Sequence, residues 1–196
     1  MAIYAPDGTQ LAVQKKGCLY FDQTYFPLFD RAVDDVEDLE AVMDKQMWAA
    51  LGSPPAPIGL DEEGLRTLKA GAEALRASTD RAILGLFGGN LMETGQFLFR
   101  MDRFLMKLAM EPKRMHHFLD RLTEIHMKNL EVYLSAVGPS IDIILFGDDL
   151  GMQTGPQISP AMYRTFFFPR HRQLWQRAKE FSDAKVMLHS CGSVSA

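Results

Sequence analysis

Residues 141–151 read IDIILFGDDLG, an apolar run that ends in a glycine and two adjacent aspartates. Two other stretches follow the same design: residues 82–87, AILGLF, precede GGN, and residues 184–188, AKVML, precede HSCG. Continuous apolar runs of this length are typical of strands buried on both faces of a parallel sheet. These three stretches therefore predict an α/β fold whose strands lie parallel to one another.

Helical patterns separate the three runs, which is the alternation expected of a parallel sheet or barrel. We expect helices over residues 61–79, 91–109, 112–137 and 160–181. The last one has Ser159 as its N-cap and Pro160 in its first turn, and Pro169 is expected to kink it. A complete eightfold barrel takes roughly 250 residues. The chain therefore holds about three βα units, either as a small open sheet or as a piece of a barrel.

The first 60 residues form a lead-in of extended and irregular pieces with one helix. Short strands are expected at residues 3–5, 11–13 and 18–21. A helix is expected over 35–51, and the proline-rich stretch 52–57 should break it. We therefore interpret 1–196 as a single domain in which residues 1–60 lead into the βα units of 61–196.

Composition excludes several classes of protein. The net charge of the 196-residue chain is −4, which argues against nucleic acid as the main partner because phosphate binding needs a clustered basic surface. No apolar run approaches the roughly 20 residues that span a bilayer, and the N-terminus does not resemble a signal peptide. The two cysteines do not suggest a disulfide framework. We expect a cytoplasmic protein with reduced thiols.

His189 and Cys191 follow the last apolar run and lie two residues apart. If the strand geometry persists, both side chains point to the same side, where they could bind zinc. A second interpretation is a buried cysteine beside a packed histidine, since cysteine is often buried. A third is a catalytic cysteine, although no partner motif supports it.

The other strand exits supply further candidates, because active sites in parallel α/β folds lie at the carboxyl ends of the strands. One of the two aspartates at 148 and 149 is expected to cap backbone groups in a turn. The other could bind a cation, hold a substrate N–H group or act as an acid. We take Asp148 and Asp149 as catalytic candidates and favour Asp148. Asn90 and Tyr163 are the expected substrate-binding residues.

Three blocks at 147–194 resemble the uroporphyrinogen decarboxylase superfamily, and a weaker likeness reaches back to about residue 17. The blocks are Gly147-Asp148-Asp149-Leu150-Gly151, then Ile158-Ser159-Pro160 with Tyr163, Phe166 and Pro169-Arg170, and finally Leu188-His189-Ser190-Cys191-Gly192-Ser193. The His-x-Cys-Gly pattern is most similar to the corrinoid-dependent methyltransferase branch, of the methylcobalamin:coenzyme M type.

The resemblance implies a (β/α)8 TIM barrel, which would be incomplete in this chain. It implies that His189 and Cys191 bind zinc together with a second cysteine far downstream, which has no counterpart in these 196 residues. It also implies a corrinoid carried by a partner protein, whose methyl group moves to a thiol. In this interpretation zinc binds and deprotonates the thiol, and Asp148 positions the substrate or supports the site.

Two alternatives remain beside the zinc-dependent methyltransferase. The first is uroporphyrinogen decarboxylase, which converts its tetrapyrrole substrate to coproporphyrinogen without a cofactor, in porphyrin and heme biosynthesis. There Asp148 or Asp149 would bind the pyrrole N–H groups and stabilise the developing cation. The second is an inactive fragment or interaction module, because a partial barrel exposes two sheet edges that can pair with other chains.

Overall fold

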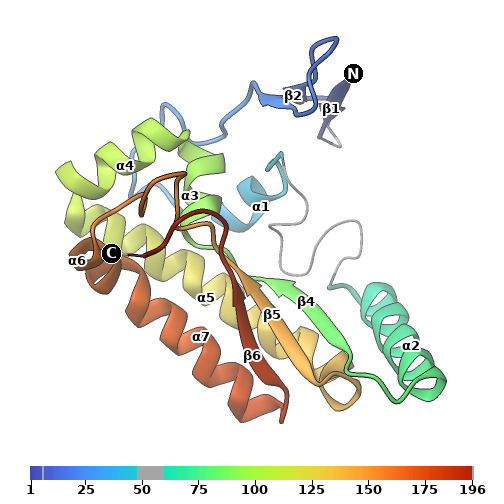
Figure 1. Cartoon of the computed structure of the whole chain (residues 1–196). Coiled ribbons are helices and arrows are strands. Elements are labelled where there is room, and N and C mark those ends of the chain that lie inside the picture. The colour runs from blue at the N-terminus through green and yellow to red at the C-terminus, as the bar shows by residue number, and fades with distance from the viewer. Residues whose placement is uncertain (6, 48–59, 196) are drawn as a thin grey trace.

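The computed structural model describes residues 1–5, 7–47 and 60–195, and Figure 1 shows the arrangement of its elements. The described residues form two three-stranded sheets. The N-terminal sheet is antiparallel and consists of β1 (Ala2–Tyr4), β2 (Gln10–Val13) and β3 (Asp22–Gln23). The second sheet is parallel, has the order β4-β5-β6, and consists of β4 (Leu84–Gly88), β5 (Ile143–Gly147) and β6 (Lys185–His189). The predicted parallel α/β arrangement is confirmed.

Helices connect the strands and flank them. They are α1 (Leu39–Met43), α2 (Glu62–Ser78), α3 (Met92–Phe99), α4 (Met101–Met110), α5 (Pro112–Val137), the 3₁₀ turn η2 (Gly138–Ser140), α6 (Pro160–Met162), the π-helical turn η3 (Tyr163–Phe167) and α7 (Phe168–Phe181). None of these helices in the described part of the chain is long and apolar enough to cross a membrane.

The long helix α5 joins two apolar cores. Near the sheet, Leu130 and Leu134 of α5 pack with Leu174 of α7 against the buried side chains of Phe87 and Ile144. Toward its N-terminus, α5 packs against α3 and α4 through a cluster of aromatic rings. In that cluster Phe118 lies edge-on to Phe99 at a ring-centroid distance of 5.1 Å. Burial of these side chains supplies most of the stability, at about 1.5–3 kcal/mol for each large apolar group.

The sequence predicts the positions of the central elements well, and in the lead-in it predicts the first two strands but not the later elements. No strand forms at 18–21, where pairing begins only at Asp22. The helix expected over 35–51 is reduced to α1 among the described residues, while its end at 48–51 and the break at 52–57 lie outside them. The helix expected over 91–109 is two helices, because Arg100 has a φ of 71° and interrupts the backbone. Pro169, where a kink is expected, lies in the first turn of α7, directly after the π turn η3.

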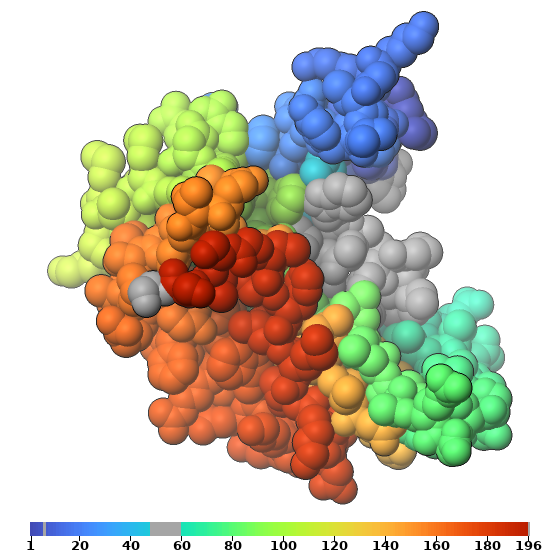
Figure 2. Space-filling model, in the orientation of Figure 1, coloured from blue at the N-terminus to red at the C-terminus, as the bar shows by residue number. Residues whose placement is uncertain are grey.

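One face of the parallel sheet is not covered by α5 and α7. Leu86 and Met187 are adjacent to Leu145 in register and point to this face, and they are 44% and 47% exposed. In Figure 1 the strands lie in front of α5, and Figure 2 shows the surfaces of β4, β5 and β6 on that side. The strands are therefore buried on one face only, which corrects the expectation of two buried faces. The arrangement matches a segment of a βα barrel wall whose inner surface is this apolar face.

Two helical glycines give a matched test of the core packing. A Cβ atom on Gly95 in α3 would overlap the Phe104 ring, whereas a Cβ on Gly71 in α2 would meet nothing within 4 Å. We expect Gly95→Ala to lower the free energy of unfolding by about 1–3 kcal/mol through overpacking. Gly71→Ala should raise it by about 0.5–1 kcal/mol because alanine favours helix. Urea denaturation measures both, and equal effects would contradict the close packing of α3 against Phe104.

Candidate functional site

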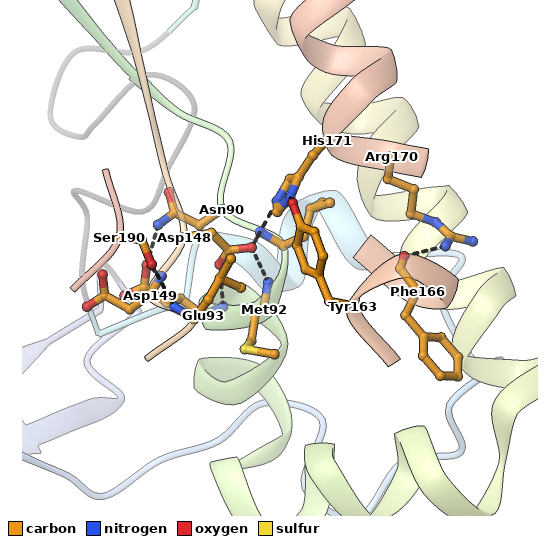
Figure 3. A network of polar contacts seen from close by, with 12 residues as sticks. Asn90, Met92, Glu93, Asp148, Asp149, Tyr163, Phe166, Arg170, His171 and Ser190 are labelled. Atoms are coloured by element: carbon orange, nitrogen blue, oxygen red, sulfur yellow. Dashed lines mark hydrogen bonds and ion pairs between the residues drawn. The ribbon is translucent and has the colours of Figure 1, made fainter. Parts of the chain in front are cut away.

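The polar residues that follow the three parallel strands meet at one edge of the sheet, as Figure 3 shows. Asn90 follows β4, Asp148 and Asp149 follow β5, and Cys191 follows β6, whose last residue is His189. Parallel strands place their carboxyl ends together, so residues distant in sequence come within reach of one another.

Asp148 lies beneath this site and has no exposed surface. One of its carboxylate oxygens accepts hydrogen bonds from the backbone N–H groups of Leu91 and Met92, and the other accepts one from Glu93. These groups form the N-terminus of α3, which has no side-chain cap of its own. The carboxylate satisfies donors that a helix otherwise leaves unpaired, and its charge complements the positive end of the helix dipole.

His171 of α7 completes the environment of Asp148. Its Nε2 lies 3.0 Å from the Asp148 carboxylate, and its Nδ1 lies 3.3 Å from the hydroxyl of Tyr163 in η3. His126 of α5 is also buried, and its Nε2 lies 3.1 Å from the carbonyl oxygen of Asn90. Burial lowers the pKa of His126 to about 4, so this imidazole is neutral near neutral pH. The three strand exits are thus supported from below by α5 and α7.

Asp149 has the opposite environment, because it is only partly buried and faces the open side of the site. Its Oδ1 accepts a hydrogen bond of 2.6 Å from the backbone N–H of Cys191 and lies 3.8 Å from His189 Nε2. The same imidazole nitrogen lies 3.1 Å from Cys191 Sγ. One ligand-type atom from each residue lies within 4.8 Å of the other two.

Close backbone packing fixes the loop that carries Cys191. Gly192 has a φ of 81°, and a Cβ there would lie 2.5 Å from the backbone of Gly151. Only glycine combines that backbone angle with so close an approach. Ser190 Oγ accepts a hydrogen bond from the Leu150 N–H, so the loops after β5 and β6 hold each other in place.

Glu93, which sequence reasoning did not single out, lies in the first turn of α3 beside Asp149. Its Oε2 accepts a hydrogen bond of 2.5 Å from the Asn90 side chain and one of 3.0 Å from the Asp149 N–H. Burial, together with the charges of Asp148 and Asp149, raises the pKa of Glu93 to about 7. The sequence does indicate Glu93 in one respect: it lies in the first turn of a helix that follows a strand, where α/β proteins place ligand-binding groups.

Two hollows flank this cluster, and Glu93 and Asp149 line both. The first, of about 190 Å³, lies at the end of the uncovered sheet face and also includes Asn90 and His189. The second, of about 410 Å³, also includes Cys191.

The structure brings together four of the six residues that the sequence singles out: Asn90, Asp149, His189 and Cys191. Asp148 is buried below them as the cap of α3, so Asp149 rather than the favoured Asp148 faces the hollows. Tyr163 reaches the site through its contact with His171, and it is not among the described residues that line either hollow.

The donor set of Asp149, His189 and Cys191 is one that zinc accepts. From the usual zinc–ligand bond lengths, donor atoms in a tetrahedral site are separated by about 3.5 Å. The separations of 3.1 and 3.8 Å fall on either side of that value. A hydrogen bond with Asp149 is the main factor that raises the pKa of the Cys191 thiol, so metal binding here would release a proton.

Comparison with known proteins gives one match at the level of the family. The family described as uroporphyrinogen decarboxylase (URO-D) matches residues 27–196 of this chain. No match is found among curated proteins.

The first prediction for the site separates the two aspartates. We expect Asp148→Asn to lower the free energy of unfolding by about 2–4 kcal/mol, because the variant leaves buried donors without a charged acceptor. Asp149→Asn should change it by less than about 1 kcal/mol, since the side chain is partly exposed. Urea denaturation of both variants measures the difference, and similar losses would contradict the assignment of Asp148 as the buried support.

The second prediction concerns pH. Glu93 binds its proton up to about pH 7 in the folded protein, against a reference pKa of 4.5 in the unfolded chain. Between these values the folded state holds the extra proton, so the Glu93 contribution to stability falls as pH rises. In metal-free protein, the free energy of unfolding of Glu93→Gln should therefore not fall in this way between about pH 4.5 and pH 7. Glu124→Gln, at an exposed carboxyl on α5, should follow the wild type, and an unchanged pH profile in Glu93→Gln would contradict the prediction.

Proposed function

This chain belongs to the uroporphyrinogen decarboxylase family, and we propose that it carries the metal-binding and acceptor side of a methyltransferase that moves a methyl group from a corrinoid to a thiol. The observation that carries the proposal is the cluster of Asp149, His189 and Cys191, with oxygen, nitrogen and sulfur donors within 4.8 Å. Asp149 supplies a third donor in addition to the two that the sequence pattern indicates.

The three side chains would hold a zinc ion, with Asp149 Oδ1, His189 Nε2 and Cys191 Sγ as donors. A bound zinc ion supplies Lewis-acid chemistry, which lowers the pKa of a substrate thiol so that it is a thiolate near neutral pH. The backbone N–H of Cys191 orients the Asp149 carboxylate through its hydrogen bond. Hydrogen bonds to a ligating carboxylate fix its direction and are typical of metal sites.

The remaining residues have roles on the substrate side. The apolar side chains of Leu86 and Leu145 line part of the smaller hollow. The Glu93 carboxyl lines the same hollow and can take up the proton that the thiol loses. A corrinoid on a partner protein would supply the methyl group and keep the electron pair of the bond that breaks, and the thiol held in this site would form the new sulfur–methyl bond.

The competing function within the family is decarboxylation of a tetrapyrrole without a cofactor. Asp149 favours it as well, because its carboxylate faces both hollows and could accept pyrrole N–H groups without any metal. Under that function His189 and Cys191 would be dispensable, so the two proposals differ in what a metal measurement shows.

The test is elemental analysis of the purified full chain. We expect about one zinc per chain, and His189→Ala or Cys191→Ser should weaken zinc binding by roughly a hundredfold or more. His117→Ala, at an exposed histidine on α5, and Cys18→Ser should keep the zinc. Zinc binding that is absent in the wild type, or unchanged in His189→Ala and Cys191→Ser, would overturn the methyltransferase proposal. Coproporphyrinogen formation by the metal-free protein would establish the decarboxylase instead.

A further inference from the structure

Three polar side chains form a chain of contacts beneath the strand exits, which Figure 3 shows. The Tyr163 hydroxyl lies 3.3 Å from His171 Nδ1, and His171 Nε2 lies 3.0 Å from Asp148 Oδ2. His171 is 2% exposed, and Asp148 has no exposed surface. Because so little of the imidazole reaches water, its two nitrogens depend on these two partners for their hydrogen bonds.

The hydrogen bonds in this chain of contacts all run in one direction. The Asp148 carboxylate already accepts from three backbone N–H groups at the start of α3, and an ionised carboxylate can only accept. His171 Nε2 therefore carries a proton and donates to Asp148. In the neutral imidazole the other nitrogen is an acceptor, so the Tyr163 hydroxyl donates to Nδ1. Burial and the charge of Asp148 raise the pKa of Tyr163, so this hydroxyl keeps its proton.

The contact between Tyr163 and His171 spans the π turn η3. Residues eight positions apart in a straight α-helix are separated by about 12 Å along its axis, and helical side chains lean toward the N-terminus. In η3 the Tyr163 carbonyl oxygen accepts a hydrogen bond from an N–H five residues further on. Pro169 has no N–H with which to restore the regular pattern, and Arg170 Nη1 donates to the Phe166 carbonyl oxygen at 2.6 Å. The contact therefore depends on the irregular backbone of this turn, a feature that is frequent at functional sites.

Asp148 connects these contacts with the loops that carry the donor atoms. Its side chain holds the start of α3, which includes Glu93, and its backbone N–H donates to the His189 carbonyl oxygen at 3.0 Å. The next residue is Asp149, whose carboxylate accepts from the Cys191 N–H. A rotation of the Asp148 side chain would therefore disturb both the start of α3 and the loops after β5 and β6.

We infer that Tyr163 and His171 are positioning residues of this site: the Tyr163 hydroxyl fixes the orientation of the His171 ring, and the ring holds the Asp148 carboxylate against α3. The Tyr163 ring is partly buried and packs against the apolar core, where a phenylalanine would fit equally well. The hydroxyl is therefore the part of this side chain that has the positioning role. The effect of both residues on zinc binding rests on the proposed function, whereas their effect on the start of α3 does not.

The first test observes the imidazole directly in the metal-free full chain. Long-range ¹H–¹⁵N NMR spectra should show His171, whose signals disappear in His171→Gln, as a neutral ring with its proton on Nε2 and a hydrogen-bonded Nδ1. Tyr163→Phe should shift the Nδ1 resonance toward that of an acceptor without a donor. Tyr25→Phe, at another partly buried tyrosine, should leave it unchanged. A ring with protons on both nitrogens, or an Nδ1 resonance that Tyr163→Phe does not move, would overturn the inference.

The second test asks whether the effect reaches α3. Hydrogen exchange of the backbone N–H groups of residues 91–93 should accelerate by roughly tenfold in Tyr163→Phe, and by more in His171→Leu. His171→Gln offers one donor and one acceptor in place of the imidazole and should keep the slow exchange of the wild type. The N–H of Leu134, in α5, is the internal control. Equal acceleration there in Tyr163→Phe would mean a general loss of stability and would contradict the positioning role.

Zinc binding separates this inference from the proposed function. In the full chain, Tyr163→Phe and His171→Leu should weaken zinc binding by roughly tenfold, while His171→Gln should stay close to the wild type. If the wild type binds no zinc but the NMR and exchange changes are present, the methyltransferase proposal falls and the positioning role stands. If zinc binds, and Tyr163→Phe and His171→Leu change neither its affinity nor the exchange of residues 91–93, the positioning role is wrong and the metal site is unaffected.

Discussion

The Asp148 carboxylate joins three parts of the chain that are far apart in sequence. Directly after β5, it accepts hydrogen bonds from the first backbone N–H groups of α3 and contacts the His171 imidazole of α7. Because the carboxylate is fully buried, each of these partners replaces water that the charge has lost. The interaction fixes where α3 begins, and it thereby fixes Asn90 and Glu93 relative to the loops after β5 and β6.

The adjacent aspartates have different roles because successive residues leaving a strand point to opposite sides. Asp148 points down to the helices, while Asp149 points to the uncovered side, where it contacts Cys191 and lies near His189. Asp148 and His171 are buried and hydrogen-bonded, whereas Asp149, His189 and Cys191 are partly or fully exposed. This division explains how a site can hold its geometry and still admit a ligand, since a rigid support limits the reorganisation that binding would require.

Sequence reasoning predicted the parallel strands and the main helices because their apolar runs and capping residues are local signals. It also predicted that the strand exits carry the candidate residues, since that follows from parallel topology. The preference for Asp148 over Asp149 could not be settled in that way, because burial depends on α3 and α7, which come from distant positions. Glu93 was missed for a similar reason: its raised pKa arises from burial and from the charges of Asp148 and Asp149, which no local pattern contains. The break at Arg100 is likewise not signalled, because a non-glycine residue with a positive φ is rare.

The carboxyl groups of Glu93, Asp148 and Asp149 lie close together at the carboxyl ends of the strands and repel one another. Each of them is compensated in a different way. Asp148 is compensated by backbone N–H groups, and Glu93 gives up charge through its raised pKa. Asp149 has one backbone donor and lies beside a thiol that holds its proton more tightly than usual. A metal ion held by Asp149 with His189 and Cys191 would remove the remaining imbalance. The same excess of negative charge therefore favours a metal ion at this edge of the sheet.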